Sequence, residues 1–214
     1  MKKEIFTFTL KDITEIAVLS AMAIVLDMFV KIPLGQTGGS LNFSMVPIFI
    51  VALRHGPFKA FIAGGIIFGL TTCLIDGYGF QTYPLEYLVA FGSTGILGFA
   101  APYIIKNFKK GVFQKVMSII FIMLAVSMWG LIRWVCASVD SMLFYEVTFM
   151  GGLTYNAVYV LPTAILDAVL VSIIIAPIMM ASKRFPTSFM MAYREKPVLS
   201  SDDNAETDTE SSIE

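Results

Sequence analysis

Hydrophobic residues in this chain come in long blocks separated by short polar connections. Six apolar segments can be drawn, at about residues 13–30, 41–55, 57–75, 85–105, 114–139 and 154–182. A helix needs about 20 apolar residues to cross a bilayer. The second segment is short and contains Pro47, so the pattern alone supports five or six membrane-spanning helices.

Composition supports the same class of protein. The chain has 214 residues, of which 57% are hydrophobic and only 14% are charged, whereas about a quarter of the residues of a soluble domain are charged. The first fifteen residues show no small-residue cleavage site, so we expect no cleaved signal peptide. The sequence predicts an all-α membrane protein with little room outside its bundle of helices.

Basic residues favour six helices over five. Lysine and arginine gather before the first segment and after the second, fourth and sixth, and are nearly absent from the alternate connections. By the positive-inside rule, both termini are cytoplasmic and the number of spans is even. Connections 31–40, 76–84 and 140–153 then lie outside.

The predicted organisation has three parts. Residues 1–12 form a cytoplasmic N-terminal segment, residues 13–185 a six-helix transmembrane substrate-binding domain, and residues 186–214 a cytoplasmic tail. The last fourteen residues hold six acids and no aromatic residue, so from about residue 200 the tail should be disordered.

The main candidate for chemistry is Glu86, at the start of the fourth segment, with Tyr78, Tyr83 and Tyr87 nearby. An acid at mid-bilayer costs roughly 2.5–3.5 kcal/mol and marks a functional site by default. The alternative is a structural salt bridge, for which Arg133 is the obvious partner. We favour binding of a small cationic ligand.

The last two segments add polar candidates. Asp140 either adds charge to the site or caps its loop, and Trp134 is either a stacking platform or an interface anchor. Asn156 opens the sixth segment, where it suits either a helix cap or recognition of an amino-substituted ring.

Small residues form a ridge on the first segment. Ala17 and Ala21, followed by Ala23, allow another helix to approach closely in lipid. That helix belongs either to an external partner or to the same bundle. Gly92 and Gly95 similarly predict close contact between helices.

Several chemistries are excluded. The sequence has no P-loop, and its single histidine, His55, falls in a cytoplasmic turn, far from any serine of the membrane core. Cys73 and Cys136 lie in apolar segments and predict neither a disulfide nor a metal site. We expect no enzymatic activity, no cofactor and no nucleic-acid partner.

These features together resemble a known family. The ridge at Ala17 and Ala21, the run 38–70, LEYLVAFGSTGILG at 85–98 and LTYNAVYVLP at 153–162 are similar to the thiamine-specific S components of energy-coupling factor (ECF) transporters. The resemblance covers nearly the whole membrane region and leaves out the acidic tail.

The resemblance implies a function and partners. Glu86 would face the thiazolium cation of thiamine, with Tyr87 beside it, Asn156 on the ligand and Tyr145 as the stacking aromatic residue. Ala17 and Ala21 would dock on a membrane-integral coupling subunit that works with two ABC-type ATPases. The protein would then be a vitamin-uptake subunit in the plasma membrane of a bacterium.

The chain also departs from the thiamine group. Ala137 stands where that group usually has a histidine, and Gly151 where it has a tyrosine. A thiamine precursor or another vitamin therefore stays open as the ligand. Two functions outside this family also stay open: a self-sufficient proton-coupled transporter that uses Glu86 or Asp140, and a membrane-embedded enzyme or assembly scaffold.

Overall fold

The computed structural model describes residues 8–34, 39–108 and 110–192. The predicted acidic tail and most of the N-terminal segment lie outside these residues. Within them the chain is almost entirely helical, and the only sheet found there is a hairpin of two short strands.

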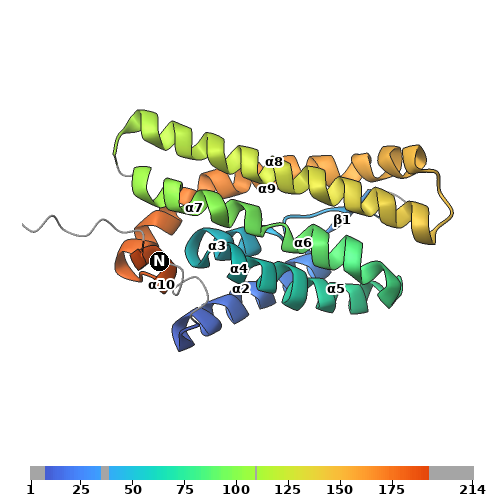
Figure 1. Ribbon diagram of the computed structural model, residues 1–214, viewed down its shortest axis with the longest axis horizontal. Helices are drawn as coiled ribbons and strands as arrows, with labels where there is room; N and C mark the ends of the chain where they lie inside the picture. Colours follow the sequence, from blue (N-terminus) through green and yellow to red (C-terminus); the bar gives the residue numbers. More distant parts are fainter. Residues whose placement is uncertain (1–7, 35–38, 109, 193–214) are drawn as a thin grey trace, which may run out of the picture.

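The elements follow one another along a single bundle (Figure 1). The helices are α2 (Leu10–Phe29), α3 (Val46–His55), α4 (Pro57–Phe61), α5 (Gly69–Asp76), α6 (Ala90–Gly92), α7 (Gly95–Asn107), α8 (Val112–Phe144), α9 (Phe149–Arg184) and α10 (Ser188–Ala192). Wider π-helical turns form η1 (Ile62–Phe68) and η3 (Tyr83–Val89), a 3₁₀ turn forms η2 (Phe80–Thr82), and strands β1 (Ile32–Pro33) and β2 (Ser40–Leu41) pair antiparallel.

The predicted apolar segments coincide with these helices. Four helical stretches of the described chain are long and apolar enough to cross a membrane: Pro57–Asp76, Phe80–Asn107, Val112–Phe144 and Phe149–Arg184. Helix α3 has ten residues, and α2 has twenty but carries four charged side chains. The helical membrane architecture is confirmed, while the count of six spans and the orientation of the termini stay predictions.

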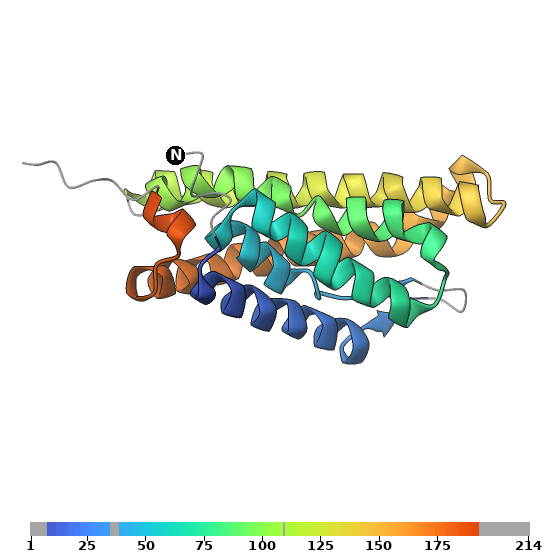
Figure 2. The ribbon, with the colours of Figure 1, turned by 60° about the horizontal axis from the view of Figure 1, so that its bottom comes forward.

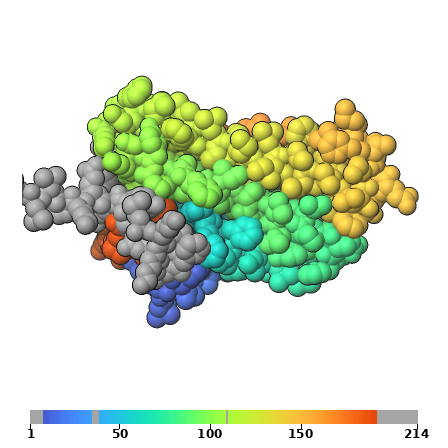
Figure 3. Space-filling model, in the orientation of Figure 1, coloured from blue at the N-terminus to red at the C-terminus, as the bar shows by residue number. Residues whose placement is uncertain are grey.

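Helices α8 and α9 form a long antiparallel pair along the molecule (Figures 1 and 2). Helix α2 packs on the opposite side, and α3 lies between α2, α7 and α9. In α3, the side chains of four residues are fully buried: Ile48, Phe49, Val51 and Leu53. On the face of the molecule that Figure 3 shows, α7 lies between α8 and α4. The shortest apolar segment is therefore the centre of the core.

Glycines bring the helices of this core into backbone contact, as the sequence predicts for Gly92 and Gly95. A Cβ atom at Gly95 would lie 2.8 Å from the carbonyl oxygen of Pro57, and one at Gly98 would lie 2.4 Å from the Pro57 nitrogen. Neither neighbour is a side chain that can rotate away. Helix α7 can therefore reach the start of α4 only because these positions lack side chains.

We expect Gly98→Ala to destabilise the protein by about 1–3 kcal/mol, because the added methyl group meets backbone atoms that have no room to move. Thermal unfolding in detergent measures the effect. Gly111→Ala is the matched control, since among the described residues its new Cβ would meet only the flexible end of Gln114, at 2.9 Å. Equal melting temperatures for the two variants would contradict the close contact.

Charged side chains are buried at the end of the bundle where α2 begins. The Lys59 ammonium lies 2.9 Å from an oxygen of Asp12, and both side chains are almost fully buried. Arg54 pairs with Glu15 and also donates to the carbonyl oxygen of Phe185 at 3.1 Å. His55 is buried too, with its two ring nitrogens 3.2 and 3.4 Å from Asp12 and Glu15. These basic residues tie helices together rather than face solvent from a loop.

Candidate ligand-binding site

A cavity of about 610 Å³ opens at the opposite end of the bundle, where α8 turns into α9. It gathers side chains from α2, the hairpin, α5, η3, α8 and α9. The residues that line it are Asp27, Lys31, Pro33, Gly39, Ser40, Asp76, Tyr78, Glu86, Tyr87, Phe91, Arg133, Ser141, Tyr145, Val147, Gly152, Tyr155, Asn156 and Tyr159. Four of the seven predicted ligand-binding residues therefore meet in one cavity: Glu86, Tyr87, Tyr145 and Asn156.

Glu86 reaches the cavity from η3, where the wider π-helical turn changes the direction in which side chains point. Such turns are rare and frequent at functional sites. The Glu86 carboxyl group lies close to that of Asp140 on α8. Among the described residues, no basic side chain comes within ion-pair distance of Glu86. The salt bridge that sequence analysis weighed as the structural alternative is therefore not formed with Arg133.

Tyrosines surround this carboxyl group. The buried Tyr87 donates a hydrogen bond from its hydroxyl to Asp76 at 3.0 Å, and Asp76 in turn lies 3.7 Å from the ammonium of Lys31. Tyr155 and Tyr159 pack edge to face, with ring centroids 5.9 Å apart. Rings with fixed polar tips and a neighbouring carboxylate are suited to a flat cation.

Two more tyrosines, Tyr78 and Tyr145, line the same cavity. Burial and the nearby Asp76 carboxylate raise the pKa of Tyr78, and burial and the Glu86 carboxylate raise the pKa of Tyr145. Both phenols therefore stay neutral at physiological pH and present uncharged rings at the cavity wall.

Asn156 sits within α9, well after its first residue, so it is not the cap of that helix. That role belongs to Thr148, whose side chain accepts from the Gly151 amide at 3.2 Å. The Asn156 side-chain amide donates to the Gly152 carbonyl oxygen at 2.9 Å and to the Ser141 hydroxyl at 3.1 Å, and its oxygen accepts from the Tyr159 hydroxyl. This network holds Asn156 in one orientation against the cavity.

Three other candidates lie behind the wall rather than on it. Tyr83 donates from its hydroxyl to the Gly65 carbonyl oxygen at 3.1 Å and stacks on Phe80. The Trp134 indole donates to the Leu153 carbonyl oxygen at 2.8 Å, joining α8 to α9. Asp140 is fully buried beside Glu86. Asp140 therefore neighbours a residue that lines the cavity, whereas Tyr83 and Trp134 join backbone segments behind it.

Sequence reasoning missed Asp27 and the hairpin. Asp27 lines the cavity from α2 and accepts hydrogen bonds from Asn42 at 3.1 Å and Ser44 at 3.3 Å. Gly39, at a φ of 83° that suits glycine, lies against the Tyr159 ring. The signal for Asp27 was present, because an acid inside an apolar segment is a candidate by the same rule that selected Glu86.

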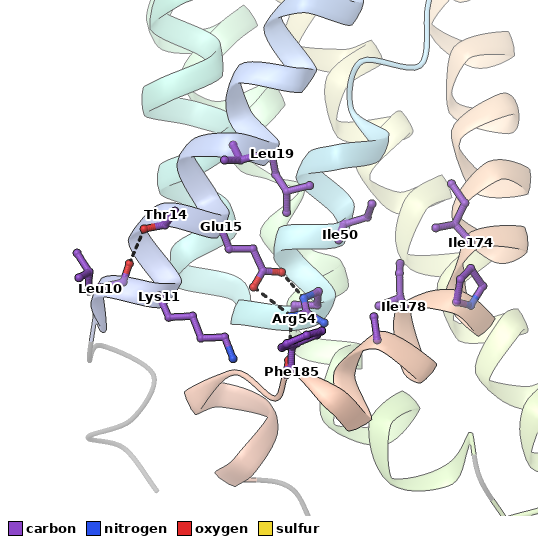
Figure 4. Close-up of a pocket in the computed structure, with 13 residues that line it drawn as sticks. Leu10, Lys11, Thr14, Glu15, Leu19, Ile50, Arg54, Ile174, Ile178 and Phe185 are labelled. Atoms are coloured by element: carbon purple, nitrogen blue, oxygen red, sulfur yellow. Dashed lines mark hydrogen bonds and ion pairs between the residues drawn. The ribbon is translucent and has the colours of Figure 1, made fainter.

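The small-residue ridge is divided between two faces of α2. Ala17 and Ala21 are exposed on the outside of the bundle, whereas Ala23 is fully buried. Next to the exposed face, a groove of about 1010 Å³ runs between α2, α3 and α9 (Figure 4). Its lining is largely apolar, with Lys11 and the Glu15–Arg54 pair at the end near Phe185. Within the described part of the chain, both alanines are therefore accessible from outside the bundle.

Comparisons with known proteins agree with this architecture. Residues 13–185 match the model of the thiamine transporter protein family Thia_YuaJ. The thiamine transporter ThiT of Bacillus subtilis (strain 168) is 30% identical over 177 residues, which cover 75% of this chain and 88% of that protein. The family and this relative are transport proteins, not enzymes.

Two solved structures share the fold. ThiT of Listeria monocytogenes superimposes with a TM-score of 0.67 at 22% identity, covering 84% of this chain and 97% of its own. The S component of a bacterial ECF transporter superimposes with a TM-score of 0.52 at 18% identity, covering 82% and 96%. The helical bundle described above is therefore the fold of these membrane proteins.

Proposed function

The chain belongs to the thiamine transporter protein family, and from this premise we propose that it is the substrate-binding subunit of an ECF-type vitamin transporter. In this role it binds thiamine or a thiamine precursor from outside the cell. The observation that carries the proposal is the cavity, in which the Glu86 carboxyl group has no basic partner among the described residues and lies among tyrosine rings. A carboxylate in such a wall attracts a planar cation more strongly than it does in water.

The proposed contacts follow from the lining of the cavity. The thiazolium ring lies against Glu86 and Tyr87, and Tyr145 stacks at the outer end. The Asn156 oxygen faces an amino group of the second ring. Asp140 lies beside Glu86 behind the wall, while Tyr83 and Trp134 join the backbone of neighbouring helices.

The proposed orientation places the cavity outside and the buried ion pairs at the cytoplasmic end. Residues 13–185 then form a six-span domain in the bacterial plasma membrane, with both termini in the cytoplasm. The distribution of basic residues supports this arrangement. Helices α2 and α3 complete the bundle beside the four longer spans.

Native mass spectrometry of the gently purified protein tests the proposed function. We expect a one-to-one adduct with the mass of thiamine, which free thiamine restores after it has been washed out. A protein that carries no adduct and binds no added thiamine would refute this assignment of the ligand.

We also propose that the exposed face of α2 docks on the coupling subunit, whose two ATPases supply the energy. Ala17→Trp should leave thiamine binding by the isolated subunit unchanged and reduce uptake by the complete transporter about tenfold or more, because a bulky side chain prevents close helix approach. Uptake of labelled thiamine by cells measures the effect. Leu124→Trp, at an exposed position on α8, is the control, and equal uptake by the two variants would contradict this docking face.

A second candidate function rests on the neighbouring carboxyl groups of Glu86 and Asp140. Two adjacent carboxyl groups can hold and release a proton, as a self-sufficient proton-coupled transporter requires. Uptake into proteoliposomes that contain only this protein and a pH gradient would favour this function. No uptake without the coupling subunit and ATPases would favour the first.

A further inference from the structure

Arg133 is a charged residue of the cavity wall that the binding of a simple cation does not explain. It lies deep within α8, and its side chain lines the cavity that Glu86 also lines. A positive charge there works against binding of a positively charged ring. An arginine at such depth is costly and marks a function by default.

Within the described residues, Arg133 makes no ion pair and no hydrogen bond. Its guanidinium group instead lies over two aromatic rings, with its central carbon 4.9 Å from the centroid of Phe91 and 5.6 Å from that of Trp129. These cation–π contacts involve the charge of the guanidinium group and use none of its N–H groups as hydrogen-bond donors. A planar fork of such donors matches a carboxylate or a phosphate.

The acids nearby do not use these donors. Asp27, Glu86 and Asp167 all lie close enough to Arg133 to interact electrostatically with it. In the described structure, however, none of their carboxylate oxygens comes within 4.0 Å of a guanidinium nitrogen. Both oxygens of the buried Asp167 lack a hydrogen-bond partner in the same structure. If Arg133 served only to neutralise the bundle, a direct pair with one of these carboxylates would be the stable arrangement.

The position of Arg133 along α8 separates it from the cation site. Asp140, which neighbours Glu86, is seven residues further along the helix, a rise of about 10 Å. Tyr145, at the outer end, is twelve residues away, a rise of about 18 Å. Arg133 therefore marks the deep end of the cavity, and Glu86 stands between it and the opening.

We propose that Arg133 forms an oxyanion subsite at the deep end of the cavity, so that the protein takes a cationic heterocycle that carries a phosphate monoester or a carboxylate. This inference rests on the proposed function, since it assumes that the cation binds at Glu86. The cation and the anion of one ligand then meet charges of opposite sign at two levels of the cavity.

Equilibrium binding of three probes tests the subsite: thiamine, its phosphate monoester (thiamine monophosphate) and its carboxylate analogue (thiamine acetic acid). For the wild-type protein we expect one of the two anionic probes to bind at least as tightly as thiamine. Arg133→Gln should reduce the affinity for that probe relative to thiamine about tenfold or more, because hydrogen bonds to charged groups are stronger than those between neutral groups. The anionic probe whose affinity relative to thiamine falls in Arg133→Gln shows whether the subsite takes a phosphate or a carboxylate.

The relative affinity separates the possible outcomes. An unchanged ratio of anionic probe to thiamine in Arg133→Gln overturns the subsite, even if all three affinities fall together, and leaves the proposed function intact. If the wild-type protein binds none of the probes, the proposed function fails with it. Should Arg133→Gln lose thiamine binding altogether, Arg133→Lys, which keeps the charge without the fork, is judged by the same ratio.

Discussion

Glu86→Gln weakens thiamine binding by more than tenfold if the carboxylate faces the bound cation. The substitution keeps the size and shape of the side chain, removes its charge and replaces one acceptor oxygen by an NH₂ donor. Loss of one partner of a buried charge pair costs about 2–5 kcal/mol, and each 1.4 kcal/mol is a factor of about ten in affinity. Isothermal titration calorimetry of the purified protein measures the change.

Glu146→Gln is the matched control for this prediction. Glu146 lies next to Tyr145 at the outer end of the cavity but does not line it, so its removal changes the charge of the opening and leaves the wall intact. We expect its affinity to stay close to that of the wild-type protein. Equal affinities for all three proteins would mean that Glu86 does not hold the cation.

Lys59→Met should be among the most destabilising single substitutions at the end of the bundle where α2 begins. It leaves Asp12, which is almost fully buried, without the ammonium that lies 2.9 Å away. Breaking a buried pair costs about 3–5 kcal/mol, which corresponds to a loss of roughly 6–20 °C in Tm for a chain of this size. Thermal unfolding followed by tryptophan fluorescence in detergent measures it.

A double variant separates charge from packing in this cluster. Asp12→Asn combined with Lys59→Met removes both charges, so it should recover part of the lost stability, which a double-mutant cycle quantifies. Lys115→Met, at an exposed position in the first turn of α8, should change stability by less than about 0.5 kcal/mol. If the single Lys59 variant melted like the Lys115 variant, the buried ion pair would not contribute to stability.

Much of the fold could be predicted from the sequence because long apolar blocks have few alternatives to membrane helices. The bounds of α8 and α9 extend the predicted segments by several residues, since apolar periodicity fades at helix ends where polar residues continue the helix. The role of α3 could not be predicted, because a short segment with Pro47 looks weak until its neighbours enclose it. In the structure Pro47 occupies the first turn of α3, where proline is tolerated.

The candidate site was predicted less completely. Glu86 was selected because a carboxyl group is costly within an apolar segment, and Asn156 because its amide suits an amino-substituted ring. The resemblance supported both residues and added Tyr145. The contributions of Asp27 and Tyr159 depend on how the hairpin and α9 pack together, and no local pattern encodes that contact. Arg54, His55 and Lys59 looked like an ordinary basic loop, because their partners Asp12 and Glu15 lie about 40 residues earlier in the chain.

The most direct test of the whole account is an experimental structure of the purified protein with thiamine added. The account predicts electron density for one thiamine molecule inside the cavity, with its thiazolium ring against the Glu86 carboxylate and its other ring near Asn156. Density elsewhere on the protein, or a Glu86 side chain turned away from the bound ligand, would contradict it.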